Sequence, residues 1–130
     1  MFIDANIFLE ILLKDRNYIK YEEFIKKLSE SNVSFYTSDF IIYPCLLTIS
    51  NKLASNSKFE NFLVFIKSIN IILIRPSIRA MYDALPLMKK YKLDFDDALV
   101  ISSMHENGIK DLVSYDNHFK KVKEINIICP

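Results

Sequence analysis

Aspartates stand at three separated places in this chain where they could act together on one metal ion. They are Asp4, the group Asp94, Asp96 and Asp97, and Asp116. Carboxylates that come close together repel one another and raise one another's pKa unless a cation neutralises them. Oxygen ligands without His or Cys suit Mg²⁺ or Mn²⁺ better than zinc. The chemistry that these residues predict is therefore binding of Mg²⁺ or Mn²⁺, provided that the fold brings them together.

The sequence predicts strands that alternate with helices, and their arrangement determines whether the acids come together. Apolar runs predict strands at residues 2–3, 33–36, 71–74, 111–114 and 125–128, and the aliphatic run 71–74 is typical of a strand covered on both faces. Helical periodicity predicts helices at about 7–12, 18–31, 40–54, 58–68 and 76–92, and a last one from the acidic group to Asn107 and Gly108. In the helix at 40–54 we expect the regular part to begin near Pro44, followed by a break at 55–57.

Hairpin signals are missing between the predicted strands, which implies right-handed crossovers and a parallel sheet. We therefore expect an α/β fold, a three-layer sandwich with a central parallel sheet of about five strands flanked by helices, in a single domain of residues 1–130. In such sheets, functional groups gather outside the carboxyl ends of the strands. Asp4 follows the first strand, Asp116 follows the fourth, and Asp97 lies at a helix start that could face the same edge.

Each of these acids also has an ordinary structural explanation. Asp94 is a good helix N-cap, and Asp96 and Asp97 then fall in the first turn, where the helix dipole favours negative charge. Asp4 could cap the helix that follows it, and Asp116 could start a turn. The prediction of a metal site depends on the joint placement of these acids rather than on any one of them.

Three segments together resemble the motifs of PIN domains: FIDANI at residues 2–7, DAL at 97–99 and VSYDNHF at 113–119. PIN domains are metal-dependent ribonucleases that include the toxins of VapBC toxin–antitoxin pairs. The resemblance implies that Asp4, Asp97 and Asp116 are the catalytic residues that coordinate Mg²⁺ or Mn²⁺. It also implies supporting roles for Asn6 and Ser114.

One departure from the family pattern concerns a glutamate early in the helix after the second strand. The expected position holds Tyr43 or Pro44, and neither side chain binds a metal as a carboxylate does. Asp39 or Asp96 could compensate, although Asp96 points roughly 100° away from Asp97 on a helix. Two functions stay open: an endoribonuclease, or a catalytically degenerate PIN domain that binds RNA or a protein without cutting.

The resemblance further implies RNA as substrate, a small antitoxin protein as partner, and a homodimer. A third class, phosphotransfer domains on a similar sheet, is disfavoured because Asn6 stands where haloacid-dehalogenase phosphatases need a second aspartate. His105, on the buried side of its helix, and His118, in a turn, are expected to have surface or core roles rather than catalytic ones.

Composition sets the remaining expectations. The net charge of +1 argues against a basic arm that holds nucleic acid by charge alone. The N-terminus does not resemble a signal peptide, and no apolar stretch approaches the ~18 residues that span a bilayer, so we expect no membrane association and a cytoplasmic protein. Cys45 and Cys129 match no metal or redox spacing and are expected to be buried free thiols.

Overall fold

A single parallel sheet forms the centre of the computed structural model, which describes residues 1–52 and 56–130. Its five strands stand in the order β3-β2-β1-β4-β5, and every neighbouring pair is parallel. The strands are β1 (Phe2–Ile3), β2 (Tyr36–Ser38), β3 (Ile72–Ile74), β4 (Asp111–Val113) and β5 (Asn126–Ile128). The expected parallel α/β sheet of about five strands is therefore confirmed.

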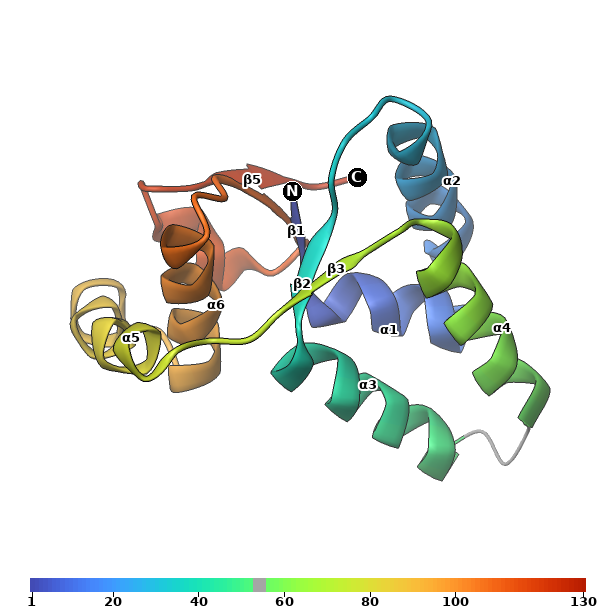
Figure 1. Ribbon diagram of the computed structural model, residues 1–130, viewed down its shortest axis with the longest axis horizontal. Helices are drawn as coiled ribbons and strands as arrows, with labels where there is room; N and C mark the ends of the chain where they lie inside the picture. Colours follow the sequence, from blue (N-terminus) through green and yellow to red (C-terminus); the bar gives the residue numbers. More distant parts are fainter. Residues whose placement is uncertain (53–55) are drawn as a thin grey trace.

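Helices flank this sheet on two sides (Figure 1). Figure 1 shows α5 (Ile78–Tyr91) and α6 (Phe95–Glu106) on one side, and α1 to α4 on the other. Those four are α1 (Ala5–Leu13), α2 (Tyr18–Ser29), α3 (Asp39–Lys52) and α4 (Asn56–Ser68), and a 3₁₀ helix, η1, covers Asn117–Lys121. Within the described residues, none of these helices has the length and apolar character needed to cross a membrane.

The central strand β1 is completely buried, with Phe2 and Ile3 at 0% exposure. Leu112 and Val113 of the adjacent β4 are equally buried and pair with them, Phe2 with Leu112 and Ile3 with Val113. Such continuous apolar strands are expected where helices cover both faces of a parallel sheet. The backbone that carries Asp4 therefore extends directly from the most protected part of the core.

Strand β2 begins three residues later than the sequence suggested, at Tyr36 instead of residue 33. The Tyr36 N–H donates to the carbonyl of Met1 at 2.8 Å, and the Ile72 N–H donates to the carbonyl of Phe35 at 2.8 Å. These bonds to both neighbours determine where the strand begins, which apolar spacing alone does not reveal. The strand ends at Ser38, which stands level with Asp4, the residue that follows β1.

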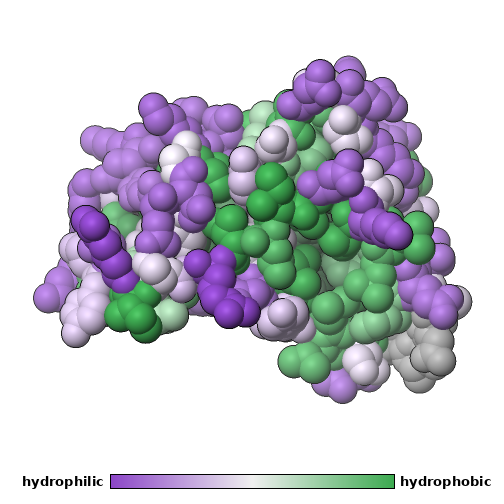
Figure 2. All heavy atoms as spheres, viewed as in Figure 1, coloured by the Kyte–Doolittle hydropathy of each residue, from purple (hydrophilic) through white to green (hydrophobic). Residues whose placement is uncertain are grey.

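The prediction that the aliphatic run of β3 is covered on both faces is wrong. This strand lies at the edge of the sheet, and Ile72 and Leu73 are 45% and 49% exposed. Exposed side chains of α3 and α4, namely Leu47, Leu63 and Val64, add to the same apolar surface. Figure 2 shows hydrophobic residues gathered over the region that β3, α3 and α4 occupy in Figure 1.

Helix α3 starts at Asp39, which confirms the predicted helix start near residue 40, but the expectation that its regular part begins near Pro44 is wrong. The Asp39 carboxylate accepts a hydrogen bond from the Phe40 N–H at 2.9 Å, which satisfies one of the free donors at a helix start. Pro44 then lies inside the helix. Helix α4 begins at Asn56, and residues 53–55, which include the end of the predicted helix and part of the predicted break, lie outside the described residues.

Helices α5 and α6 pack closely and carry the acidic group to the sheet. The hydroxyl of Ser102 in α6 donates to the carbonyl of Ala80 in α5 at 2.6 Å, and Ala84 and Ala98 are completely buried. These small side chains allow the two helix backbones to approach. Gly108, with φ of 65°, follows α6, as the sequence predicted for a helix that stops at residues 107–108.

Candidate metal centre

Asp4 lies at the carboxyl end of β1 and is only 8% exposed. Its Oδ1 accepts the Ala5 N–H at 2.7 Å, and Asp4 is the N-cap of α1, the structural role that its place before a helix suggested. Its Oδ2 accepts hydrogen bonds from the Asn6 amide at 2.6 Å and from the Ser114 hydroxyl at 2.7 Å. The pKa of Asp4 is raised above its ordinary value, mainly by burial and further by the charges of Asp116 and Asp96, while the hydrogen bonds from Ser114 and Ala5 oppose the shift.

Ser114 connects the ends of the two central strands. Since Ile3 pairs with Val113, Ser114 stands level with Asp4. Besides donating to Asp4, its Oγ accepts the Asn6 Nδ2–H at 2.9 Å and the Asp116 N–H at 3.0 Å. The resemblance assigned Asn6 and Ser114 supporting roles, and the structure places both in direct contact with Asp4.

Asp97 lies in the first turn of α6, half-buried, with its carboxylate near the other acids. Burial, followed by the charges of Asp96, Asp116 and Asp4, raises the pKa of Asp97 to about 6, and His118 lowers it slightly. Acids from three remote segments therefore act electrostatically on one another. Among the described residues, the compact group of possible ligand atoms contains Asp97 and Asp116 but not Asp4, which is linked to Asp116 through the Ser114 hydroxyl.

Asp116 and His118 complete this group. Asp116 starts η1, where its Oδ1 accepts the His118 N–H at 2.8 Å. The Nδ1 of His118 lies 3.5 Å from Asp97 Oδ2 and 3.6 Å from Asp116 Oδ1. Within residues 1–52 and 56–130, one potential ligand atom from each of Asp97, Asp116 and His118 falls within 4.8 Å of the others.

His118 is the residue near the acids that sequence reasoning left out of the site. The one available signal was its position two residues after Asp116 in a turn, which allows its ring to fold back over the carboxylate. His105, expected on the buried side of its helix, is instead exposed, so that expectation is wrong.

Two other acids of the late segment behave differently from each other. Asp94 is the N-cap residue of α6, as predicted, but its exposed side chain makes no capping hydrogen bond with the described residues. Asp96 is also exposed, yet its charge raises the pKa of both Asp4 and Asp97. Asp96 therefore contributes to the field of the site although its helical position directs it away from Asp97.

Helix α3 brings no carboxylate to the acids. Tyr43 is 54% exposed and Pro44 is exposed too, whereas the buried side of the helix carries Cys45, whose Sγ lies 4.0 Å from the carbonyl oxygen of Ala5. Burial, and secondarily Asp4, raises the pKa of the Cys45 thiol to about 12. Asp39 forms an ion pair with Arg75 at 2.9 Å.

The second cysteine departs from expectation. Cys129 is exposed, so the prediction that both thiols are buried holds for Cys45 and is wrong for Cys129. Position 129 directly follows the edge strand β5.

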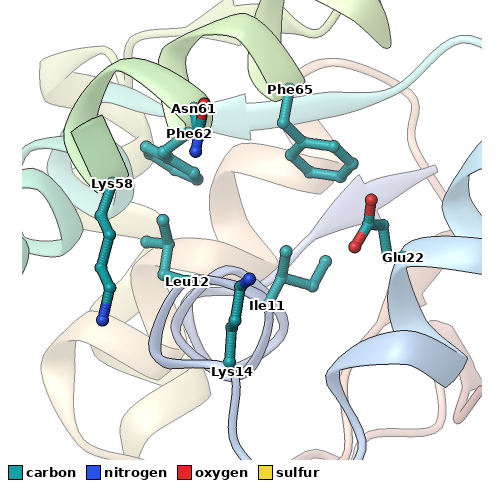
Figure 3. A pocket seen from close by; sticks show the side chains of 8 residues that line it. All are labelled: Ile11, Leu12, Lys14, Glu22, Lys58, Asn61, Phe62 and Phe65. Carbon is teal, nitrogen blue, oxygen red and sulfur yellow. The ribbon is translucent and has the colours of Figure 1, made fainter.

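A pocket of about 280 Å³ lies between α1, α2 and α4, away from these acids. Figure 3 shows Phe62 and Phe65 of α4 opposite Ile11 and Leu12 of α1, with charged side chains at the margin. None of the acids described above lines it. This pocket is therefore separate from the candidate metal centre.

The residues present fit a divalent cation. Ser38, completely buried, stands level with Asp4 because Phe2 pairs with Tyr36, and its Oγ has no hydrogen-bond partner among the described residues. The buried Oδ1 of Asn6 likewise lacks one within the described chain. Buried polar atoms are normally satisfied by protein, water or an ion. Unsatisfied oxygen atoms beside mutually repelling carboxylates favour a hydrated cation.

Comparison with known proteins agrees with the fold. Residues 1–125 match the family model of the PIN domain, and the chain belongs to the PIN domain family. No curated protein sequence matches this chain.

Three of the solved structures similar to this one belong to VapBC or other toxin–antitoxin systems. VapBC2 from Rickettsia felis, solved with a DNA fragment from its promoter, has a TM-score of 0.78 at 14% identity over 98% of this chain and 96% of the other. A Klebsiella pneumoniae toxin–antitoxin complex has a TM-score of 0.71 at 15% identity over 98% and 95%. VapC20 of Mycobacterium tuberculosis, a Sarcin–Ricin loop cleaving toxin, has a TM-score of 0.72 at 14% identity over 95% of both chains.

Proposed function

We propose that this protein is an endoribonuclease that depends on Mg²⁺ or Mn²⁺ and cleaves RNA phosphodiesters. Asp4, Asp97 and Asp116 would hold the metal. The observation that carries the proposal is the placement of these acids at one edge of the sheet. Possible ligand atoms of Asp97 and Asp116 lie within 4.8 Å of each other, and the Ser114 Oγ both donates to Asp4 and accepts the Asp116 N–H. Membership of the PIN domain family supports the same reaction class.

The bound metal would activate a water molecule and neutralise charge on the phosphate that is attacked. The protein's own part is to hold the ligands in place. Ser114 and Asn6 fix Oδ2 of Asp4, and the Ser114 Oγ also accepts the Asp116 N–H, so one hydroxyl aligns two of the three acids. Preorganised ligands of this kind reduce the reorganisation needed during the reaction.

Substitution of single acids tests the proposal. Asp4→Asn and Asp97→Asn should each abolish Mn²⁺-dependent cleavage of a single-stranded RNA, because each removes a ligand charge while keeping the side-chain size. Asp94→Asn is the matched control, since Asp94 starts the same helix but is exposed and makes no capping bond with the described residues. Full activity in both site variants would refute the proposal.

The biological role that we propose is that of the toxin in a toxin–antitoxin pair, with a small antitoxin protein as partner. Support comes from the similar structures, two of which are toxin–antitoxin complexes. A cytoplasmic location is a further part of this proposal, and a homodimer is the assembly we expect from the resemblance. Coexpression with the product of a neighbouring gene, followed by purification of the complex, tests the partner.

A catalytically degenerate PIN domain that binds RNA or protein is the alternative. The observation that favours it is α3, which presents Tyr43 and Pro44 to solvent and brings no carboxylate to the acids. Calorimetry separates the two functions: micromolar Mn²⁺ binding that disappears in Asp116→Asn supports the nuclease, and no binding supports the alternative.

A further inference from the structure

The acids of the candidate metal centre have a nitrogen donor beside them. His118 Nδ1 lies 3.5 Å from Asp97 Oδ2 and 3.6 Å from Asp116 Oδ1, too far for good hydrogen bonds. Two ligands of one ion with bonds of about 2.1 Å stand about 3 to 3.5 Å apart. The two distances from His118 Nδ1 are therefore close to those between neighbouring ligands of a common ion.

Helix α3 does not supply the carboxylate ligand that the family pattern places there. Tyr43 and Pro44 are exposed, and Asp39 is paired with Arg75. Cys45 is buried with its sulfur against the Ala5 carbonyl. Among the described residues, η1 is the element that places a nitrogen donor beside Asp97 and Asp116.

His118 is free to serve in this way. Its side chain is 64% exposed, and its ring nitrogen contacts only the two carboxylates in the part of the chain that the structure describes. Its backbone N–H bonds to Asp116 Oδ1, which holds the residue next to the acid without involving the ring. The ring can therefore turn towards an ion with little structural cost.

A separate observation points to an ion at the same edge. Ser38 Oγ is completely buried, has no partner among residues 1–52 and 56–130, and stands level with Asp4 on the neighbouring strand. In-register residues of parallel strands direct their side chains to the same face of the sheet. A hydrated cation held by the acids would give this hydroxyl the water partner that it lacks.

We propose that His118 is a metal ligand together with Asp97 and Asp116, and that its imidazole takes the place of the absent carboxylate from α3. The proposal rests on the proposed function, because it assumes that the acids bind a divalent ion. Imidazole is a good ligand for Mn²⁺ and other transition ions, whereas Mg²⁺ prefers oxygen ligands and water. The site should therefore select Mn²⁺ over Mg²⁺.

The test compares metal binding by His118→Gln with that by His105→Gln. Both histidines are exposed, so neither substitution disturbs the core, and His105 lies at the far end of α6 from Asp97. We expect His118→Gln to weaken Mn²⁺ binding about ten- to hundredfold by calorimetry and to change Mg²⁺ binding less than about threefold. We expect His105→Gln to match the wild type for both ions.

Pulsed electron paramagnetic resonance of the Mn²⁺-loaded protein provides a readout independent of affinity and activity. A ¹⁴N coupling from a directly bound imidazole should be present in the wild type and in His105→Gln, and absent in His118→Gln. Mn²⁺ binding that depends on Asp97 but shows no ¹⁴N coupling would overturn the role of His118 and leave the proposed function intact. No Mn²⁺ binding by the wild type would overturn both.

Discussion

The Ser114 hydroxyl donates a hydrogen bond to Oδ2 of Asp4 at 2.7 Å, across the junction of the two central strands. Both residues follow directly after strands that pair in register, so the sheet itself determines their separation. Ser114 Oγ also accepts the N–H of Asp116. One hydroxyl thus couples the most protected strand of the core to two acids of the candidate metal centre.

Replacement of this hydroxyl should destabilise the protein. Ser114→Ala leaves the Asp116 N–H and the Asn6 amide without their shared acceptor, and Ser114 is completely buried. Because an unsatisfied buried polar group costs about 1–3 kcal/mol, the free energy of unfolding should fall by that amount. Urea denaturation measures it.

Ser31→Ala is the control for this substitution. Its hydroxyl donates to the carbonyl of Leu28 at 2.7 Å in a single local contact at the surface, whereas the Ser114 hydroxyl makes three contacts in the interior. The free energy of unfolding should stay within about 0.5 kcal/mol of the wild type. Equal losses of unfolding free energy in both variants would contradict a stabilising role for the buried Ser114 hydrogen bonds.

The acids of the site were predictable because each is tied to a local pattern. Asp4 follows an apolar pair, Asp97 opens a helical period, and Asp116 follows a predicted strand, so topology alone sends them to one edge. His118 was missed because its proximity depends on the turn of η1, which bonds the His118 N–H to Asp116. Side chains in a turn follow no regular periodicity, so the sequence does not predict which way the ring of a histidine there points.

The errors in the fold have a common physical origin in long-range contacts. The start of β2 is set by bonds from Tyr36 to Met1 and from Ile72 to Phe35, between segments about 35 residues apart. The exposure of Ile72 follows from the place of β3 at the sheet edge, and strand order is not encoded in the hydrophobicity of a single strand. Helix starts and ends, which depend on near neighbours, were predicted more closely at α5 and α6.

Gly108 offers a test of backbone strain without side-chain clash. Its φ is 65°, and a Cβ at this position would meet nothing within 4 Å. Gly108→Ala should therefore lower the free energy of unfolding by about 1 kcal/mol through the left-handed backbone alone. Gly108→Asn should cost less, because Asn tolerates this region better. Thermal melts compare the two, and a larger loss for Asn would contradict the explanation.

The two cysteines should differ in reactivity in the folded protein. Cys129 is exposed, whereas Cys45 is buried and has a pKa raised to about 12 by that burial and by Asp4. Since the thiolate is the reactive form, Ellman's reagent at pH 8 should modify Cys129 quickly and leave Cys45 unmodified. Both should react in urea. Rapid modification of native Cys129→Ser would contradict the burial of Cys45.

Asp97 should make the metal-free protein less stable as pH rises. Its pKa is 3.8 as an ordinary carboxyl and about 6 in the folded chain, so the folded state holds the proton more tightly. The resulting stabilisation is complete below about pH 4 and is lost as pH rises through about 6. After allowance for the solvent around a half-buried carboxyl, the loss should be about 1 kcal/mol.

Comparison of the wild type with Asp97→Asn isolates this contribution. In the presence of a chelator, Asp97→Asn should be more stable than the wild type by about 1 kcal/mol at pH 7.5, and the two should converge near pH 4, as measured by urea denaturation at each pH. Addition of Mn²⁺ at pH 7.5 should reverse the order, because an ion that binds the folded state stabilises it and the variant lacks a ligand. A constant difference between the two proteins from pH 4 to pH 7.5 would show that Asp97 does not lie in the field of Asp96, Asp116 and Asp4.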